Sequence, residues 1–218
     1  MDTKTILQHV DHTILSPQAT WKEVKTICEE AQWANAASVC IPPCFVKQAV
    51  VYLHDTIPVC TVVGFPHGNV PSEIKVFEAE YALSSGASEV DMVINVGMVK
   101  EENWEELFAE LRAMRKASQG AVLKVIVETC LLTEAEKVSL CHFVSKAGAD
   151  YIKTSTGFST GGATVEDVLL FRTHLAPGVK IKASGGIRSF EAAQAYLRAG
   201  ADRLGSSALI PLAKQEKS

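Results

Sequence analysis

The chain alternates between strand-like and helix-like segments along its length. Eight short strand-like runs are each followed by a stretch with helical patterning. Strict alternation of this kind favours a parallel sheet of βαβ units over a sandwich or a helical bundle. In a chain of 218 residues, eight such units predict an α/β fold, a single-domain (β/α)8 TIM barrel spanning residues 1–218. The alternative architecture is an open, doubly wound sheet.

The expected boundaries follow from capping residues, prolines and glycines. The expected strands are residues 11–15, 37–41, 59–63, 89–94 and 123–128, a segment containing Lys153, a segment containing Lys182, and residues 203–206. The expected helices are residues 20–31, 44–54, 72–84 and 101–116, segments opening at Thr133 and Thr164, and residues 189–198 and 208–214. No long linker or shift in composition marks a boundary between domains.

A short internal repeat relates the fourth, sixth and eighth strands. Each is preceded by a small residue, Gly and Ala, with the glycines at positions 86, 148 and 200. The fifth residue after each glycine is Asp91, Lys153 or Gly205. Because even-numbered strands contribute side chains to shared layers of a barrel interior, we expect Asp91 and Lys153 to point into the same space.

Two lysines end neighbouring strands just before glycine-containing loops. Burial of Lys153 and repulsion from Lys182 are expected to lower a lysine pKa, so that the uncharged amine can attack a carbonyl and form an imine. Asp91 with a water molecule is suited to moving protons. Lys124 on the fifth strand is expected to orient that carboxylate. The competing interpretations are a lysine that extends out of the barrel mouth and an Asp91 that makes only a structural ion pair.

Glycines in three successive loops indicate a phosphate site. They are Gly157 after the sixth strand, Gly185 and Gly186 after the seventh, and Gly205 before Ser206 and Ser207 after the eighth. Backbone N–H groups approach an anion closely at glycine, and barrels often bind phosphate in the last loops. Each glycine alone is explained equally well by a tight turn. Arg188 either assists this site or is a solvated helix residue.

The first strand contributes weaker signals. Asp11 and His12 resemble an acid–base pair, while Asp11 and Thr13 either close the barrel floor or line the pocket. Together with Lys124 and Thr156, we expect Asp11 and Thr13 to support the site.

Composition excludes several classes of function. A formal net charge of -4 argues against a nucleic-acid or anionic-membrane surface. No stretch approaches the ~20 apolar residues of a membrane span, and the N-terminus does not resemble a secretion signal. The six cysteines are scattered and lack the spacing of a metal site, so we expect reduced thiols in a cytoplasmic protein and no structural metal.

The sequence resembles the deoxyribose-phosphate aldolase family, short bacterial type, over nearly the whole chain. The stretches that carry the resemblance are Asp11-His12-Thr13, residues 89–97, residues 123–129, Lys153-Thr154-Ser155-Thr156-Gly157-Phe158, residues 182–188 and Gly205-Ser206-Ser207. Six such stretches in the same order are far more specific than a generic barrel pattern.

The resemblance implies a class I aldolase, without cofactor or metal, that reversibly cleaves 2-deoxy-D-ribose 5-phosphate to acetaldehyde and D-glyceraldehyde 3-phosphate. The Schiff-base lysine of the family corresponds to Lys153, and its proton-transfer residues correspond to Asp91 and Lys182. The partners implied are phosphosugar and aldehyde substrates, neither nucleic acid nor membrane, and further copies of the chain in a homodimer or homotetramer. Longer members carry a basic residue where this chain has Phe158, and a tyrosine tail where this chain ends with residues 215–218.

Two other functions fit the same residues. A phosphosugar isomerase or epimerase on this barrel needs a base but no imine. A non-catalytic phosphosugar-binding barrel needs neither. The two lysines together with Asp91 favour the aldolase.

Overall fold

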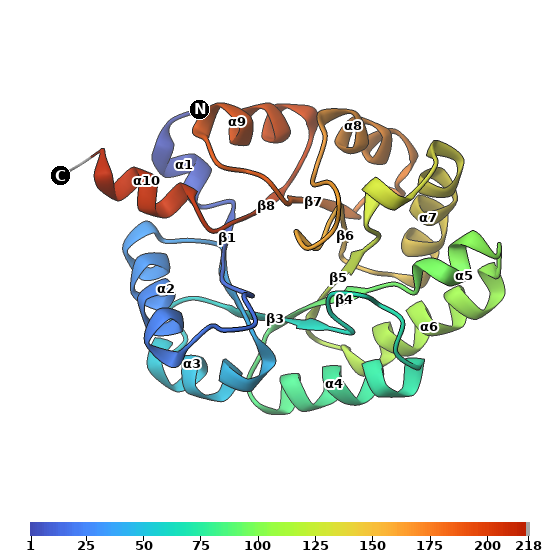
Figure 1. The fold of residues 1–218 in the computed structure, drawn as a ribbon, viewed down its shortest axis with the longest axis horizontal. Helices are drawn as coiled ribbons and strands as arrows, with labels where there is room; N and C mark the ends of the chain where they lie inside the picture. The colour runs from blue at the N-terminus through green and yellow to red at the C-terminus, as the bar shows by residue number, and fades with distance from the viewer. Residues whose placement is uncertain (217–218) are drawn as a thin grey trace.

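The computed structural model describes residues 1–216, and eight parallel strands close into a barrel (Figure 1). β1 pairs with both β2 and β8, so the (β/α)8 prediction is confirmed and the open sheet is wrong. The strands are Val10–Thr13 (β1), Ser38–Ile41 (β2), Val59–Val63 (β3), Glu89–Val93 (β4), Val122–Ile126 (β5), Tyr151–Lys153 (β6), Lys180–Ser184 (β7) and Arg203–Ser206 (β8).

Helices form a ring around this barrel (Figure 1). They are Thr3–Leu7 (α1), Trp21–Ala34 (α2), Val46–Leu53 (α3), Ser72–Ser84 (α4), Val96–Lys100 (α5), Trp104–Ala117 (α6), Glu134–Ala147 (α7), Val165–His174 (α8), Phe190–Ala199 (α9) and Leu209–Gln215 (α10), with 3-10 turns at Pro43–Phe45 (η1) and Thr129–Leu131 (η2). None of the helices within residues 1–216 has both the length and the apolar character needed to cross a bilayer. Two residues of the C-terminal tail noted above, Lys217 and Ser218, lie outside the described residues.

Local capping explains where the helices begin. The capping boxes expected at Thr20 and Thr133 are both confirmed. The helix expected over 101–116 is confirmed as α6, which begins at Trp104. A short helix that was not predicted, α5, precedes it, and Glu102 at a φ of 54° lies between the two. The side chains of Asn95 and Asn103 each accept a hydrogen bond from a backbone N–H at the start of one of these helices.

The apolar core has two unequal parts. The large part lies between the outer face of the barrel and the helices and includes Val39 and Ile41 of β2. Cys40 lies between these two residues and so faces the opposite side, the barrel interior. There it forms a separate small cluster with Cys60 and Val62. The barrel interior is therefore apolar beside β2 and β3, while charged side chains from the other strands occupy the remainder.

Candidate active site

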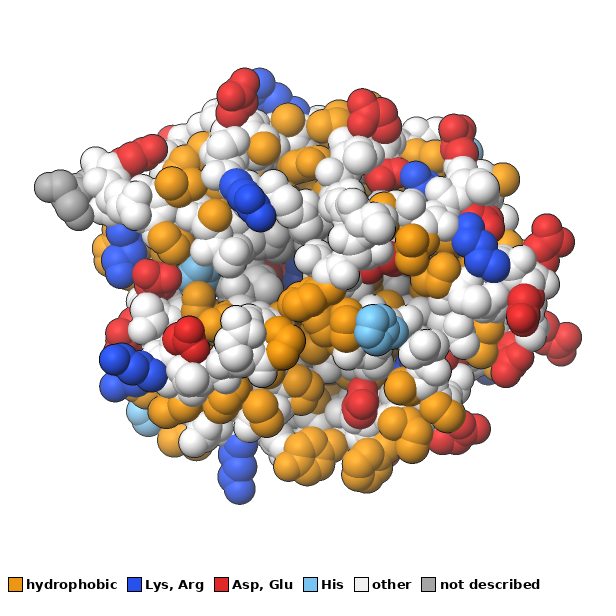
Figure 2. All heavy atoms as spheres, viewed as in Figure 1, with side chains coloured by type: hydrophobic (Ala, Val, Ile, Leu, Met, Phe, Trp, Pro, Cys, Tyr) orange, Lys and Arg blue, Asp and Glu red, His pale blue; other side chains and the backbone are white. Residues whose placement is uncertain are grey.

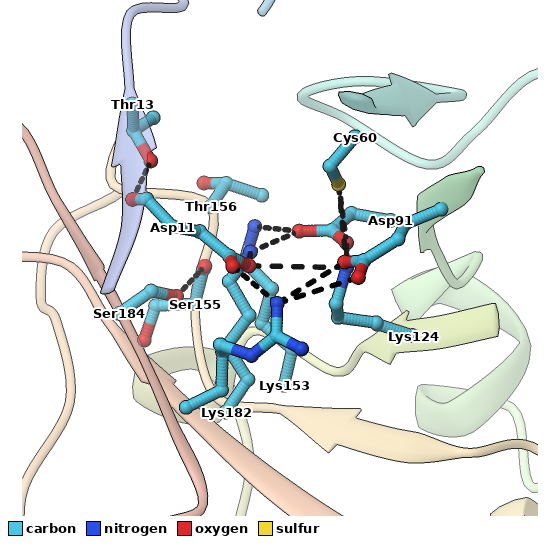
Figure 3. A network of polar contacts seen from close by, with 12 residues as sticks. Asp11, Thr13, Cys60, Asp91, Lys124, Lys153, Ser155, Thr156, Lys182 and Ser184 are labelled. Atoms are coloured by element: carbon cyan, nitrogen blue, oxygen red, sulfur yellow. Dashed lines mark hydrogen bonds and ion pairs between the residues drawn. The ribbon is translucent and has the colours of Figure 1, made fainter. Parts of the chain in front are cut away.

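Asp91 lies at the centre of a buried group of charged side chains (Figure 3). Its Oδ2 accepts hydrogen bonds from Lys153 Nζ at 2.7 Å and from Lys182 Nζ at 2.6 Å. Its Oδ1 accepts one from Lys124 Nζ at 2.8 Å. All four side chains are buried. The structure thus brings together Asp91 and Lys153, as the repeat predicted, and places the two other lysines around the same carboxylate.

Strand register explains this convergence. Asp91 of β4 is paired with Lys124 of β5, and Lys153 of β6 is paired with Lys182 of β7. Paired residues on neighbouring strands lie ~4.8 Å apart and point to the same face. Two adjacent pairs on one side of the barrel therefore direct three long side chains and one short carboxylate into a common space.

Carboxylate partners keep two of the buried lysines, Lys182 and Lys124, charged. Burial opposes charge on Lys182, but Asp11 and Asp91 outweigh it and hold the pKa of Lys182 above its usual value. Asp91 raises the pKa of Lys124 against burial in the same way. Enclosure in the barrel therefore does not lower the pKa of Lys182 or Lys124, because each has carboxylate partners at short range.

The lysines hold Asp91 ionised in return. Burial alone would raise the pKa of Asp91, yet the ammonium groups of Lys124 and Lys182 help to hold it well below its usual range. The pKa of Asp11 is also lowered, because Lys182, Lys124 and Arg203 outweigh its burial. Both aspartates are thus carboxylates around neutral pH.

Further charged side chains lie closer to the N-terminal ends of the strands and contact the same lysines. Asp11 contacts Lys182 Nζ at 2.5 Å and Arg203 Nη1 at 2.5 Å. Glu89 contacts Lys124 Nζ at 2.5 Å and Arg203 Nη1 at 3.2 Å. The sequence analysis missed Glu89 and Arg203. The signal was available, because Glu89, Tyr151 and Arg203 each follow a repeat glycine by three residues.

Asp11 and His12 do not form an acid–base pair. They are consecutive strand residues, so their side chains point to opposite faces of β1. Asp11 points into the barrel, whereas His12 Nε2 lies 2.8 Å from Glu30 Oε2 of α2, outside the barrel. The resemblance to a catalytic pair is therefore wrong.

A cavity of about 360 Å³ opens above Lys153. Figure 2 shows the hollow near the centre of the face viewed in Figure 1. The lining includes the other residues expected at the site: Thr13, Thr156, Gly157, Gly185, Gly186, Arg188, Gly205, Ser206 and Ser207. Lys153 is the one lysine of the buried group that reaches this cavity among its described lining residues.

Two glycines give the cavity its shape. Gly185 has a φ of 86°, and a Cβ there would lie 2.9 Å from the Gly162 Cα, so the two loops can touch only without side chains. Gly205 is the third position of the repeat, where a Cβ would lie 3.4 Å from Lys182 Cε and 2.8 Å from Ser184 Cβ. The absence of a side chain at Gly205 therefore leaves room for Lys182.

Hydrogen bonds fix the loops at the cavity wall. Thr156 donates from its backbone N–H and its hydroxyl to the buried carboxylate of Glu128. The Ser206 hydroxyl donates to the Ile187 carbonyl at 2.8 Å and accepts from the Ala208 N–H at 3.1 Å. These hydrogen bonds thus fix the loops after β6, β7 and β8 beside the cavity.

Comparison with known proteins places this arrangement in a family. The family model described as DeoC/LacD family aldolase matches residues 5–209. The chain belongs to this family of aldolases. A deoxyribose-phosphate aldolase of Clostridium botulinum is 48% identical over 218 residues, which are 100% of this chain and 99% of that protein. One of Clostridioides difficile is 48% identical over 213 residues, covering 98% and 97% of the two chains.

Solved structures agree with the sequence relatives. A structure described as a unique tetrameric deoxyribose phosphate aldolase from Aeropyrum pernix matches with a TM-score of 0.91 and 32% identity, covering 100% of this chain and 93% of that one. The aldolase therefore shares both sequence and barrel geometry with this group along its length.

The buried charged group around Asp91 does not suit a divalent cation. Ligand atoms of Cys40, Cys60 and Asp91 lie within 4.8 Å of one another, which is close enough to hold a metal ion. However, the ammonium groups of Lys124 and Lys182 already contact the two oxygens of Asp91. A divalent ion there would face like charge at short range, so these side chains are better described as a thiol–carboxylate hydrogen-bond network.

Proposed function

We propose that this aldolase reversibly cleaves 2-deoxy-D-ribose 5-phosphate to acetaldehyde and D-glyceraldehyde 3-phosphate through a Schiff base on Lys153. One observation carries the proposal: Lys153 reaches the cavity while its Nζ contacts Asp91, which Lys182 and Lys124 also contact. An amine on the cavity floor, beside an ionised carboxylate and a fixed ammonium, has what carbonyl attack and proton transfer require. The deoxyribose-phosphate aldolases named above support this proposal as relatives of the chain.

We infer from the balance of charge in the barrel that Lys153 is the lysine that reacts. Three carboxylates (Asp11, Glu89 and Asp91) face four cationic side chains (Lys124, Lys153, Lys182 and Arg203) within the described barrel interior. The group is neutral when one of the four carries no charge. Lys153 contacts one carboxylate oxygen and shares it with Lys182, whereas Lys182 and Lys124 each contact further carboxylates.

The reaction then proceeds by electron flow into the imine. Lys153 Nζ adds to C1 of the open-chain sugar, and water leaves. Removal of the 3-hydroxyl proton breaks the C2–C3 bond, with its electron pair passing into the iminium to give an enamine and glyceraldehyde 3-phosphate. Protonation at C2 and hydrolysis release acetaldehyde. We assign the proton transfers to Asp91 acting with a water molecule, and the fixed positive charge beside it to Lys182.

The glycine loops are the proposed phosphate site. Gly157, Gly185, Gly186 and the segment Gly205-Ser206-Ser207 border the cavity together with Arg188. Backbone N–H groups and one guanidinium suit a phosphate dianion. Phe158 supplies an apolar wall at the same cavity and packs edge-on against Phe65, with 5.3 Å between the two ring centroids.

A coupled assay tests the proposed function. Glyceraldehyde 3-phosphate released from 2-deoxyribose 5-phosphate is measured for the wild type, Lys153→Leu and Lys153→Arg. We expect release by the wild type and none by either variant, because neither side chain forms an imine. Partial activity of Lys153→Arg would support the isomerase or epimerase mechanism instead, in which a charge is sufficient. If the phosphosugar stabilises the wild type against unfolding but is not cleaved, the result would support a non-catalytic barrel.

We also propose a cytoplasmic homo-oligomer, a homodimer or a homotetramer. All six cysteines are free thiols, which suits a reducing compartment. Hydrophobic side chains gather over α4 (Figure 2), where Ile74, Phe77 and Tyr81 are 48%, 65% and 59% exposed. Exposed apolar groups on one helix face are typical of a subunit contact. Sedimentation equilibrium of the wild type measures the assembly, and a monomer at all concentrations would contradict it.

A further inference from the structure

Cys60 is the one thiol drawn in contact with the charged group (Figure 3). It is on β3, fully buried, and its Sγ lies 3.1 Å from Asp91 Oδ1. Lys124 Nζ, which binds the same oxygen, lies 3.3 Å from that sulfur. Cys60 therefore contacts both members of the Lys124–Asp91 ion pair.

The thiol is a hydrogen-bond donor to the carboxylate. Burial, followed by its contacts with Cys40 and with Asp91, raises the pKa of Cys60 well above its usual value. The sulfur thus keeps its proton around neutral pH, while Asp91 has none to donate. The S–H bond is directed at Oδ1, and the sulfur accepts in turn from Lys124.

An aspartate with lysine partners alone is poorly oriented. The rotation of a carboxylate about its terminal bond has a broad energy profile, and an ammonium group on a flexible chain acts as a point charge. Cysteine has a single side-chain torsion, and Cys60 is fixed by a strand that pairs directly with β4. A contact from Cys60 to Oδ1 therefore sets the plane of the carboxylate and directs Oδ2 to Lys153 and Lys182.

We propose that Cys60 is a positioning residue for Asp91, holding its carboxylate in the orientation that moves protons at the reacting carbon. This inference rests on the proposed aldolase reaction and deepens it. Removal of the thiol slows the proton-transfer steps and leaves substrate binding intact, because Cys60 is absent from the lining of the cavity.

Three variants separate positioning from packing. Cys60→Ala removes the donor, and Cys60→Ser keeps a hydroxyl donor in its place. Cys141→Ala is the matched control, since Cys141 is equally buried but lies on α7, outside the barrel. For each protein, kcat and KM are measured with 2-deoxyribose 5-phosphate. Exchange of the methyl protons of acetaldehyde in D2O is followed by NMR, because it reports proton transfer at the enamine carbon.

The proposal predicts a specific pattern. Cys60→Ala loses ~10-fold in kcat and in exchange rate, about the effect of one hydrogen bond, while KM stays within ~2-fold. Cys60→Ser recovers most of both rates, and Cys141→Ala matches the wild type. The proposal is overturned if Cys60→Ala keeps wild-type rates, or if Cys60→Ala, Cys60→Ser and Cys141→Ala lose activity alike, as a packing defect would.

A spectroscopic measurement that needs no catalysis tests the Cys60–Asp91 hydrogen bond independently of the proposed reaction. The infrared S–H band of Cys60, obtained as wild type minus Cys60→Ala, is compared with that of Cys141 obtained in the same way. A hydrogen bond to a carboxylate weakens the S–H bond, so the Cys60 band is expected at lower wavenumber. A band at or above that of Cys141 overturns the proposal even in an active enzyme. Failure of the wild type to release glyceraldehyde 3-phosphate would instead refute the proposed reaction.

Discussion

Lys182 is charged because two carboxylates contact it in a closed space. Its Nζ lies 2.5 Å from Asp11 and 2.6 Å from Asp91. The same contacts make the residue both structural and functional, since its loss removes one cationic partner from each of two buried carboxylates. Activity and stability should therefore fall together when Lys182 is removed.

The variant Lys182→Met tests this coupling. We expect a loss of about 100-fold or more in kcat and a decrease of about 3–5 kcal/mol in the free energy of unfolding, as for other broken buried ion pairs. Lys180→Met is the control, because Lys180 is an exposed lysine on the same strand. Steady-state kinetics and denaturant unfolding measure both effects. Unchanged stability in Lys182→Met would contradict the charged network.

Single residues were predictable where the sequence repeats them. The recurrence of Gly and Ala before three strands located Asp91 and Lys153 in one space. The same recurrence also predicts that Glu89 and Arg203 lie together, one layer below. Cys60 could not have been predicted, because no repeat marks it and a lone strand cysteine usually packs as a small hydrophobe.

Among the elements, the loops that follow β6, β7 and β8 are the ones we propose to bind the phosphate of the substrate. Glycine at 185 is required by its positive φ and by the approach of Gly162. Gly185→Ala should raise KM for 2-deoxyribose 5-phosphate ~10-fold, about one lost hydrogen bond to the anion. The effect on unphosphorylated 2-deoxyribose should be smaller.

A matched glycine variant controls for backbone strain. Gly178 also has a positive φ, of 96°, but a Cβ there would meet nothing within 4 Å. Steady-state kinetics of Gly178→Ala should therefore match the wild type. Equal losses with the phosphorylated and unphosphorylated sugars in Gly185→Ala would show that these loops do not bind phosphate.

Element type was more predictable than element boundaries. The capping boxes at Thr20 and Thr133 use side chains adjacent in sequence, so local patterns identify them. The start of α6 depends on Asn103 and a left-handed Glu102, and the unpredicted α5 begins at Asn95; none of these residues stands out strongly in the sequence pattern. Tertiary packing decides such cases, because propensity is a weak prior.

For the whole molecule, the buried charges set the pH range of stability. The pKa values of Asp11 and Asp91 are lowered on folding, so their contribution is present above about pH 4 and is lost as pH falls toward the folded values. Those of Lys124 and Lys182 are raised, so their contribution is present below about pH 10 and is lost at higher pH. This network should be most stabilising between these limits.

The variant Asp11→Asn tests the acid limit. It should be less stable than the wild type at neutral pH and should lose less further stability below about pH 4, because one proton-linked group is absent. Denaturant unfolding from pH 2 to about pH 8 measures this, with the exposed Asp55→Asn as control. Parallel curves for Asp11→Asn and the wild type would contradict the linkage.

The central claim is that the amine of Lys153 forms the imine. Acetaldehyde and borohydride are added to the wild type, Lys182→Met and Lys180→Met, and the modified residue is located by peptide mass spectrometry. We predict one reduced two-carbon adduct, on Lys153, in the wild type and in Lys180→Met, and much slower labelling in Lys182→Met. An unmodified Lys153, or labelling at Lys182 or at surface lysines alone, would contradict the account.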